Sequence, residues 1–225
     1  MSRSLLATLQ LADSALPIGR FVHSHGVEAW LRAYRGAREP ELRALIASAV
    51  CEGFAPLDGA ALAHAHRAEG VARLLELDEL LTARKLAPPA RASSQACGRQ
   101  LAALAGELTS DPLVASLGHH VRSGETDGNL AVVEGAVARA LGLPVRDAVV
   151  VELRGAAAGL LSAAVRLGRL APTRAQLVLL ELAPAIERAT DEALALDVRD
   201  LRAGAFELEL CALVHGRADA RFFAT

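Results

Sequence analysis

The stretch PVRDAVVVELRGAAAGLLSAAVRL, residues 144–167, indicates the class of fold that this sequence adopts. A proline suits the first turn of a helix, and the residues after it are mainly alanine, leucine and valine. One side of the expected helix carries Ala157, Leu160, Leu161, Ala164 and Val165. This spacing predicts a helix at the hydrophobic centre of the protein, where Gly155 and Gly159 would let a neighbouring helix come close.

The composition extends this expectation to the whole chain. Hydrophobic residues make up 52% of the 225 residues, but aromatic residues make up only 3%. Alanine and leucine favour helices, whereas sheets favour aromatic and β-branched residues. The length is sufficient for a substantial core, and no repeat, linker or change in composition divides the chain. We therefore predict an all-α fold, a single-domain bundle of roughly ten helices over residues 1–225.

The helical periodicity and the turn residues give an approximate position for each helix. Helices are expected at residues 3–12, 20–34, 39–51, 57–69, 71–86, 89–107, 129–141, 144–167, 172–196 and 206–215, with a short helix between loops in 108–128. The helix over 172–196 is expected to bend at Pro184, because proline removes a backbone hydrogen bond.

The charge pattern disfavours nucleic acids and membranes as partners. The 24 basic and 26 acidic residues are interspersed and give a net charge of −2, which provides no basic surface. The longest uncharged apolar run, Gly155 to Val165, is shorter than the roughly 20 residues that span a bilayer. Polar residues interrupt the first apolar segment, unlike a signal peptide. We expect a cytoplasmic protein that binds neither nucleic acid nor membrane.

The sequence contains no recognisable catalytic motif. No Gly-x-x-x-x-Gly-Lys-Ser/Thr segment is present, and no glycine-rich turn follows a strand. Ser24 lies between His23 and His25, but sequence neighbours do not face each other on a helix. A Gly-x-Ser-x-Gly elbow is also absent. No catalytic residue is therefore predicted.

Three close histidine pairs raise the question of a metal site. They are His23 and His25, His64 and His66, and His119 and His120, while His215 stands alone. Histidines two residues apart on a helix diverge by about 200°, and one pair supplies too few ligands for a closed site. The metal content stays open. An independent all-α metal-binding protein or hydrolase that uses these pairs is the alternative hypothesis.

The end of the chain and Arg166 are candidates for contacts with a partner. Phe222 and Phe223 place two of only five phenylalanines within the last four residues. Such aromatic surface is expected to pack against either the protein itself or a partner. Arg166 either interacts with the negative end of its own helix or donates to a partner's carboxylates. The sequence leaves both alternatives open.

Four strings spread over the chain carry a resemblance to a known family. They are LQLADSALPIGRFVHSHGVE (9–28), LTARKL with ARASSQACGRQL (81–86 and 90–101), NLAVVEG through SAAVRLG (129–135 to 162–168), and HGRADARFFAT (215–225). In this order they resemble the UreF family of urease accessory proteins, including its Leu-Pro-x-Gly turn. The sequence departs from the family at Arg20, where small residues are frequent, and at Ala171-Pro172, where the family often carries Gly-Gln.

The resemblance implies an all-α protein without enzymatic activity. Members of the family act as chaperones for nickel insertion, form homodimers, bind UreD/UreH and recruit the GTPase UreG to apo-urease. No tightly bound cofactor is implied, and nickel is expected only in transit.

The resemblance also implies two groups of site residues. The first is a partner-docking C-terminal tail, residues 216–225, in which Arg221 is a charged anchor. The partner-binding residues are expected to be His215, Arg217, Arg221, Phe222, Phe223 and Arg166. The second group forms the opening turn and an assembly surface or nickel path, and consists of Pro17, Gly19, His23, His25 and Glu28. The alternative is that this turn is purely structural.

Overall fold

The computed structural model describes residues 2–215 and 222–223, and within these residues it contains helices and no strand. The all-α prediction is therefore confirmed. The elements are α1 (Ser2–Ala12), η1 (Arg20–Val22), α2 (Val27–Ala33), α3 (Glu39–Ser48), η2 (Ala49–Gly59), α4 (Ala60–His66), α5 (Val71–Arg84), α6 (Pro88–Leu108), α7 (Pro112–Ser123), α8 (Leu130–Ala140), α9 (Val145–Arg166), α10 (Pro172–Glu181), α11 (Ala183–Ala195), η3 (Val198–Asp200) and α12 (Phe206–His215). The segments η1 and η3 are 3₁₀-helices, and η2 is a π-helix.

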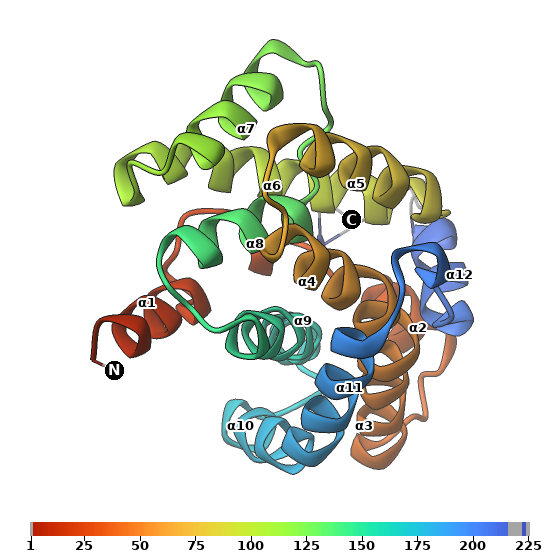
Figure 1. Ribbon diagram of the computed structural model, residues 1–225. Coiled ribbons are helices and arrows are strands. Elements are labelled where there is room, and N and C mark those ends of the chain that lie inside the picture. Colours follow the sequence, from red (N-terminus) through yellow and green to blue (C-terminus); the bar gives the residue numbers. More distant parts are fainter. Residues whose placement is uncertain (1, 216–221, 224–225) are drawn as a thin grey trace.

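Helix α9 runs through the middle of the molecule (Figure 1). It packs against α1, α2, α3, α4, α8, α10, α11 and η2. Of the face expected from the sequence, Ala157, Leu160, Leu161 and Ala164 are buried and Val165 is half-buried. The prediction that residues 144–167 form the hydrophobic centre is confirmed.

Two helical segments are long and apolar enough to cross a membrane, judged by length and composition only. They are Glu39–His66 and Val145–Arg166, and 67% of the most apolar window of each is buried within the protein. Core helices of globular proteins have the same apolar composition, because they are covered on most sides by other helices.

The close contact between α4 and α8 depends on a glycine. A Cβ atom on Gly135 of α8 would lie 2.6 Å from the carbonyl oxygen of Leu62 and 2.9 Å from the Cβ of Ala65, both on α4. Real Cβ atoms do not approach backbone oxygens this closely, so only glycine fits here without a shift of the helices.

The predicted helix over residues 20–34 is wrong in its first half. Only the 3₁₀ turn η1 forms there, and α2 begins at Val27. The interruption is a left-handed backbone at two successive residues, His25 with φ 49° and Gly26 with φ 97°. A Cβ on Gly26 would lie 2.5 Å from the carbonyl oxygen of Leu208, so this glycine also lets α12 lie directly against the start of α2.

Two further helix boundaries differ from the sequence-based expectation. The predicted helices 39–51 and 57–69 form one continuous helical run, because the chain passes from α3 to α4 through the π-helix η2 around Pro56. The predicted bent helix 172–196 is two helices that meet at Leu182. Pro184 lies in the first turn of α11, where its missing N–H group is not needed.

We predict that Gly135→Ala lowers the free energy of unfolding by about 1–3 kcal/mol, because the added methyl group overpacks the contact with α4. Gly106→Ala is the matched control. It lies in α6 with no atom within 4 Å of the added Cβ, so it should stabilise the protein by about 0.5–1 kcal/mol. Urea denaturation measures both variants, and equal effects would contradict the role of Gly135.

Candidate functional site

A buried ionic cluster lies between the opening turn and the two central helices. The turn reaches Gly19, whose φ of 81° is left-handed, and η1 then carries the Arg20 side chain into the interior. The Arg20 guanidinium lies 2.5 Å from the Glu134 carboxylate on α8 and 2.9 Å from the Glu152 carboxylate on α9. All three side chains are at least nine-tenths buried. The cluster therefore ties three segments that are distant in the sequence.

Gly155 provides the space for Arg20. A Cβ atom at this position would overlap the guanidinium of Arg20. One turn later in α9, a Cβ atom at Gly159 would lie 3.9 Å from the carbonyl oxygen of Arg20. The sequence predicted that these glycines admit a neighbouring helix. In the structure the neighbour that comes close is the 3₁₀-helix η1 with its arginine.

Burial changes the ionisation of the cluster. Burial raises the pKa of Glu134 to about 8, with the nearby charge of Glu152 adding to the shift and that of Arg20 opposing it. Burial alone would lower the pKa of Arg20, but the charges of Glu134 and Glu152 outweigh it and raise that pKa. Near neutral pH the cluster therefore holds a protonated Glu134 beside a charged Arg20.

A second buried ion pair lies nearby. The ammonium of Lys85, just after α5, is 2.7 Å and 2.8 Å from the two carboxylate oxygens of Asp58 in η2. Burial raises the pKa of Asp58, and the charge of Lys85 opposes this shift. Glu152 and Arg20 also act electrostatically on Asp58, so the pair and the cluster form one network of buried charges.

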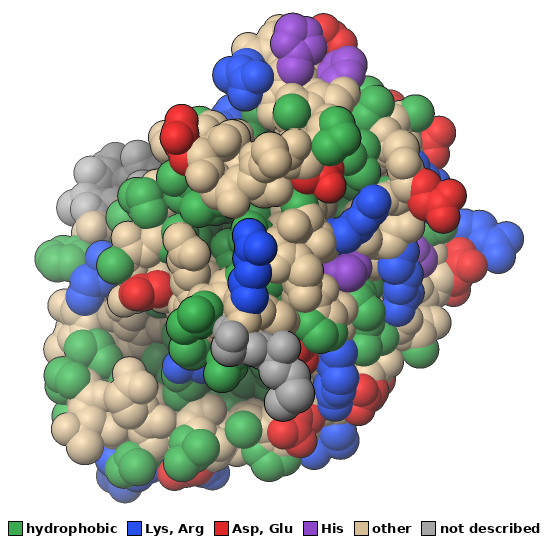
Figure 2. Space-filling model, turned by 60° about the vertical axis from the view of Figure 1, so that its left-hand side comes forward, with side chains coloured by type: hydrophobic (Ala, Val, Ile, Leu, Met, Phe, Trp, Pro, Cys, Tyr) green, Lys and Arg blue, Asp and Glu red, His purple; other side chains and the backbone are tan. Residues whose placement is uncertain are grey.

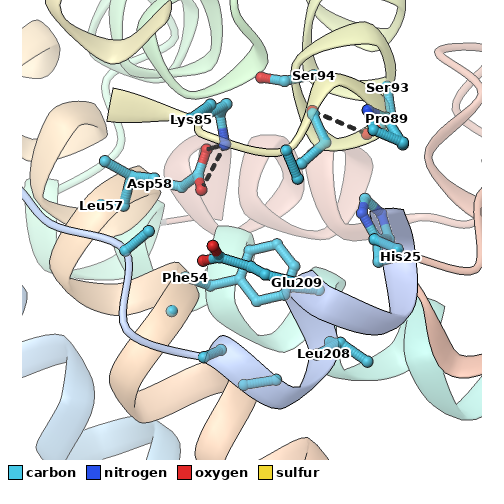
Figure 3. Close-up of a pocket in the computed structure, with 18 of the residues that line it drawn as sticks. His25, Phe54, Leu57, Asp58, Lys85, Pro89, Ser93, Ser94, Leu208 and Glu209 are labelled. Carbon is cyan, nitrogen blue, oxygen red and sulfur yellow. Dashed lines mark hydrogen bonds and ion pairs between the residues drawn. The ribbon is translucent and has the colours of Figure 1, made fainter. Parts of the chain in front are cut away.

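A cavity of about 110 Å³ adjoins this network. Its walls come from η2, from the start of α6 and from α12, and Figure 3 shows the Asp58–Lys85 pair at one side. Arg20 and Glu152 also line it. The other labelled residues in the view are His25, Phe54, Leu57, Pro89, Ser93, Ser94, Leu208 and Glu209. The cavity is thus mainly apolar, with charged groups along part of its wall.

His25 places its ring in the wall of this cavity (Figure 3). Burial, together with the positive charges near it, lowers the pKa of His25 to about 3. The imidazole is therefore neutral at physiological pH. Its ring meets Phe54 edge to face, with the two centroids 5.7 Å apart.

The end of the chain returns to α2 through a buried carboxylate. Glu28 is fully buried and accepts hydrogen bonds from the backbone N–H groups of Phe222 and Phe223 at 3.0 Å and 3.1 Å. The Phe223 ring is 5% exposed, with the guanidinium carbon of Arg166 4.2 Å from its centroid. Arg166 also donates to the carbonyl oxygen of Phe21. Phe223 and Arg166 therefore make contacts within the protein. Phe222, by contrast, presents its ring to solvent.

The structure places the other expected site residues as follows. Pro17 and Gly19 are exposed on the opening turn, whereas His23 and Glu28 lie inside the protein instead of on an exposed surface. His215 is the last residue of α12. Arg217 and Arg221 lie outside the described residues, so their contacts stay a prediction.

The other histidine pairs point to different parts of the protein. The Nε2 atoms of His64 and His66 lie 2.9 Å and 2.8 Å from the carbonyl oxygens of Leu196 and Leu143, respectively. The ring of His120 is 2.7 Å from the Glu125 carboxylate at the distal end of α7, where Figure 2 shows histidine and charged side chains gathered together. Within residues 2–215 and 222–223, no three His, Cys, Asp or Glu side chains converge as ligands of one ion.

The buried carboxylates were not among the site residues expected from the sequence. Glu134 and Glu152 each lie within an apolar run, LAVVEGAVA and AVVVELRG, on helices that are otherwise hydrophobic on most sides. A charged residue in such a run needs a partner in the interior, because an unpaired buried charge is very costly. In the structure this partner is Arg20.

Comparisons with known proteins match this chain to one protein family. The UreF family model matches residues 36–183. The chain is 30% identical to the urease accessory protein UreF of Yersinia enterocolitica serotype O:8 / biotype 1B (strain NCTC 13174 / 8081), and the match covers 98% of this chain and 97% of that protein. The UreF proteins of Yersinia pseudotuberculosis serotype IB (strain PB1/+) and Yersinia pestis (strain Pestoides F) show the same identity and coverage.

The raised pKa of Glu134 predicts a dependence of stability on pH. Between its ordinary value of 4.5 and about 8, the folded protein binds one more proton at this site than the unfolded chain. This contribution is fully present below pH 4.5 and is lost as the pH rises to 8. We expect the free energy of unfolding to fall by about 1–2 kcal/mol between pH 6.5 and pH 8, because Glu134 loses its proton over this range.

Glu134→Gln should remove this loss, because the amide still accepts from Arg20 and donates to Glu152 but does not titrate. Urea denaturation at pH 6.5 and pH 8 tests the wild type, the variant and an exposed control, Glu69→Gln, which should behave as the wild type. An unchanged pH dependence in Glu134→Gln would refute the assignment of the proton.

Proposed function

The chain belongs to the UreF family of urease accessory proteins, and we propose that it bridges UreD/UreH and the GTPase UreG while the urease dinickel centre is assembled. In this proposal it is a cytoplasmic, non-enzymatic chaperone that works as a homodimer and meets apo-urease through its partners. Nickel is cargo in transit and not a resident cofactor. The neutral imidazole of His25 in the cavity wall supports this part of the proposal, because neutral imidazole is the form that binds metals.

The observation that carries the proposal is the exposed apolar side of α12, which we name the α12 face. It consists of Phe206, Leu210, Leu213 and Val214, whose side chains are 40% to 66% exposed. Their spacing of four, seven and eight residues places them on one side of the helix. The opposite side of α12 buries Leu208 and Ala212 in the protein. A helix that is apolar on both sides is normally covered on both, so the α12 face is suited to a protein partner.

The docking of the chain end supports the same surface. α12 packs on α2, and Glu28 of α2 binds the backbone of Phe222 and Phe223. The Phe222 ring is 66% exposed, and aromatic side chains are frequent among the residues that dominate binding energy. We propose that the α12 face and Phe222 bind UreD/UreH, and that Arg217 and Arg221 contribute charged contacts from the tail.

We predict that Leu210→Glu weakens co-purification with UreD/UreH at least tenfold, because it places a charge at the centre of the α12 face. Leu6→Glu is the matched control: Leu6 lies on α1 and is 66% exposed, close to the 62% of Leu210. Both variants should keep the wild-type melting temperature, because both side chains are mainly in solvent. Equal binding by the two variants would show that the α12 face is not the docking surface.

Deletion of residues 216–225 is expected to leave the helical fold intact and to abolish co-purification with UreD/UreH. The deletion removes the exposed Phe222 and the charged tail residues, and it also removes the buried Phe223, so the melting temperature is expected to fall while the helix content is kept. Circular dichroism measures the helix content of the shortened protein, and a pull-down with tagged UreD/UreH measures binding. Phe222→Ala separates the ring from the rest of the tail, because it keeps the backbone that Glu28 binds. Binding of the shortened protein at the wild-type level would contradict the proposal.

A further inference from the structure

The charges around the cavity do not balance. Its two cations are already occupied, because Arg20 is paired with Glu134 and Glu152, and Lys85 is held by both oxygens of Asp58. This network contains three carboxyl groups and two cations. A further carboxyl group in the wall therefore has no cation of its own in a cavity that is mainly apolar.

Glu209 is that further group. It is a half-buried residue of α12, and its carboxylate reaches into the cavity beside the Phe54 ring (Figure 3). Within residues 2–215 and 222–223, its side chain has no hydrogen-bond or ion-pair partner. Burial raises the pKa of Glu209, and the charge of Lys85 only partly opposes this shift. The cavity thus holds one carboxyl group that has no bonded partner among these residues.

The rest of the wall suits the stem of an organic cation. Leu57, Leu86, Pro89 and Leu208 supply apolar surface beside the carboxylate. Leu86 lines the cavity and is 67% exposed, so the cavity reaches the protein surface there. The volume of about 110 Å³ leaves room for several water molecules or for a small organic group.

The aromatic rings in the wall also favour a positive charge. Phe54 lies beside Glu209, and aromatic rings attract cations through the negative charge of their faces. The neutral ring of His25 does not repel a cation and offers a hydrogen-bond acceptor. A small anion is less suited to this site, because both cations in the wall already face carboxylates.

We propose that this cavity is a binding site for an alkylammonium group, with Glu209 as its counter-ion and the apolar wall around its stem. The site goes beyond the proposed docking role and requires no partner of urease maturation. The ammonium group comes either from a free small amine or from a lysine side chain of another polypeptide. Both sources share one chemistry, a positive nitrogen at the end of a methylene chain.

Titration of the full chain with n-butylammonium chloride, followed by NMR, tests the proposal at constant ionic strength. The amide signals of Phe54, Leu86 and Glu209 should shift together and saturate, and n-butanol should leave them unchanged. Glu209→Gln should weaken binding by about 10- to 100-fold, as expected for loss of a charged hydrogen bond. The exposed control Glu69→Gln should bind as the wild type.

A second measurement does not depend on the folding of a variant. In the wild type, bound butylammonium should lower the pKa of Glu209 by about 1–3 units, read from its carboxyl ¹³C resonance, because a cation favours the ionised carboxylate. Absence of saturable binding, equal binding by Glu209→Gln, or an unchanged Glu209 pKa would each overturn the proposal.

The source of the ammonium group is resolved with two short peptides that differ only in a central lysine or norleucine. Binding of the lysine peptide at least tenfold more tightly than butylammonium assigns the site to a polypeptide side chain. Weaker binding of the lysine peptide than of butylammonium assigns it to a free amine. Equal binding of the lysine and norleucine peptides would contradict the role of the charge.

Discussion

The burial of one arginine constrains the arrangement of the central helices. Arg20 enters the interior from the opening turn and must find negative charge there, because an unpaired buried cation is very costly. It finds Glu134 on α8 and Glu152 on α9, and the missing side chain of Gly155 leaves space for it. Loss of Arg20 would leave the buried carboxyl groups without a cation, and breaking a buried ion pair typically costs about 3–5 kcal/mol. The opening turn, α8 and α9 therefore hold one another in a fixed relation.

This constraint also shapes the cavity. Arg20 and Glu152 form part of its wall, and the Asp58–Lys85 pair belongs to the same network of charges. α12 closes another side, and it lies close to α2 because Gly26 has no side chain at the contact. The closing helix is thus the same helix that carries the exposed α12 face. A partner on the outer side of α12 and an occupant of the cavity would contact opposite sides of one helix.

Much of the helical architecture could be predicted from periodicity, but the local breaks and the buried charges could not. The expected helices 71–86, 89–107, 129–141 and 206–215 agree with α5, α6, α8 and α12 within two residues at each end. The prediction of a helix over 20–34 was wrong because nothing in the sequence indicates the left-handed backbone conformation of His25. The site was missed because periodicity assigns a charged residue to the exposed face. The family resemblance pointed to the opening turn, but Arg20 was only a position at which the sequence differs from the family. The contacts of Arg20 with Glu134 and Glu152 become visible only in the tertiary structure.

Glu28 recognises the chain end through backbone N–H groups, which every residue except proline possesses. These hydrogen bonds do not depend on the side chain at position 222, whereas the side chain of Phe223 fills a buried space. A substitution at position 222 therefore changes the exposed surface and keeps the backbone contacts that attach this segment to α2. Attachment and surface chemistry are thus set by different parts of the same residue.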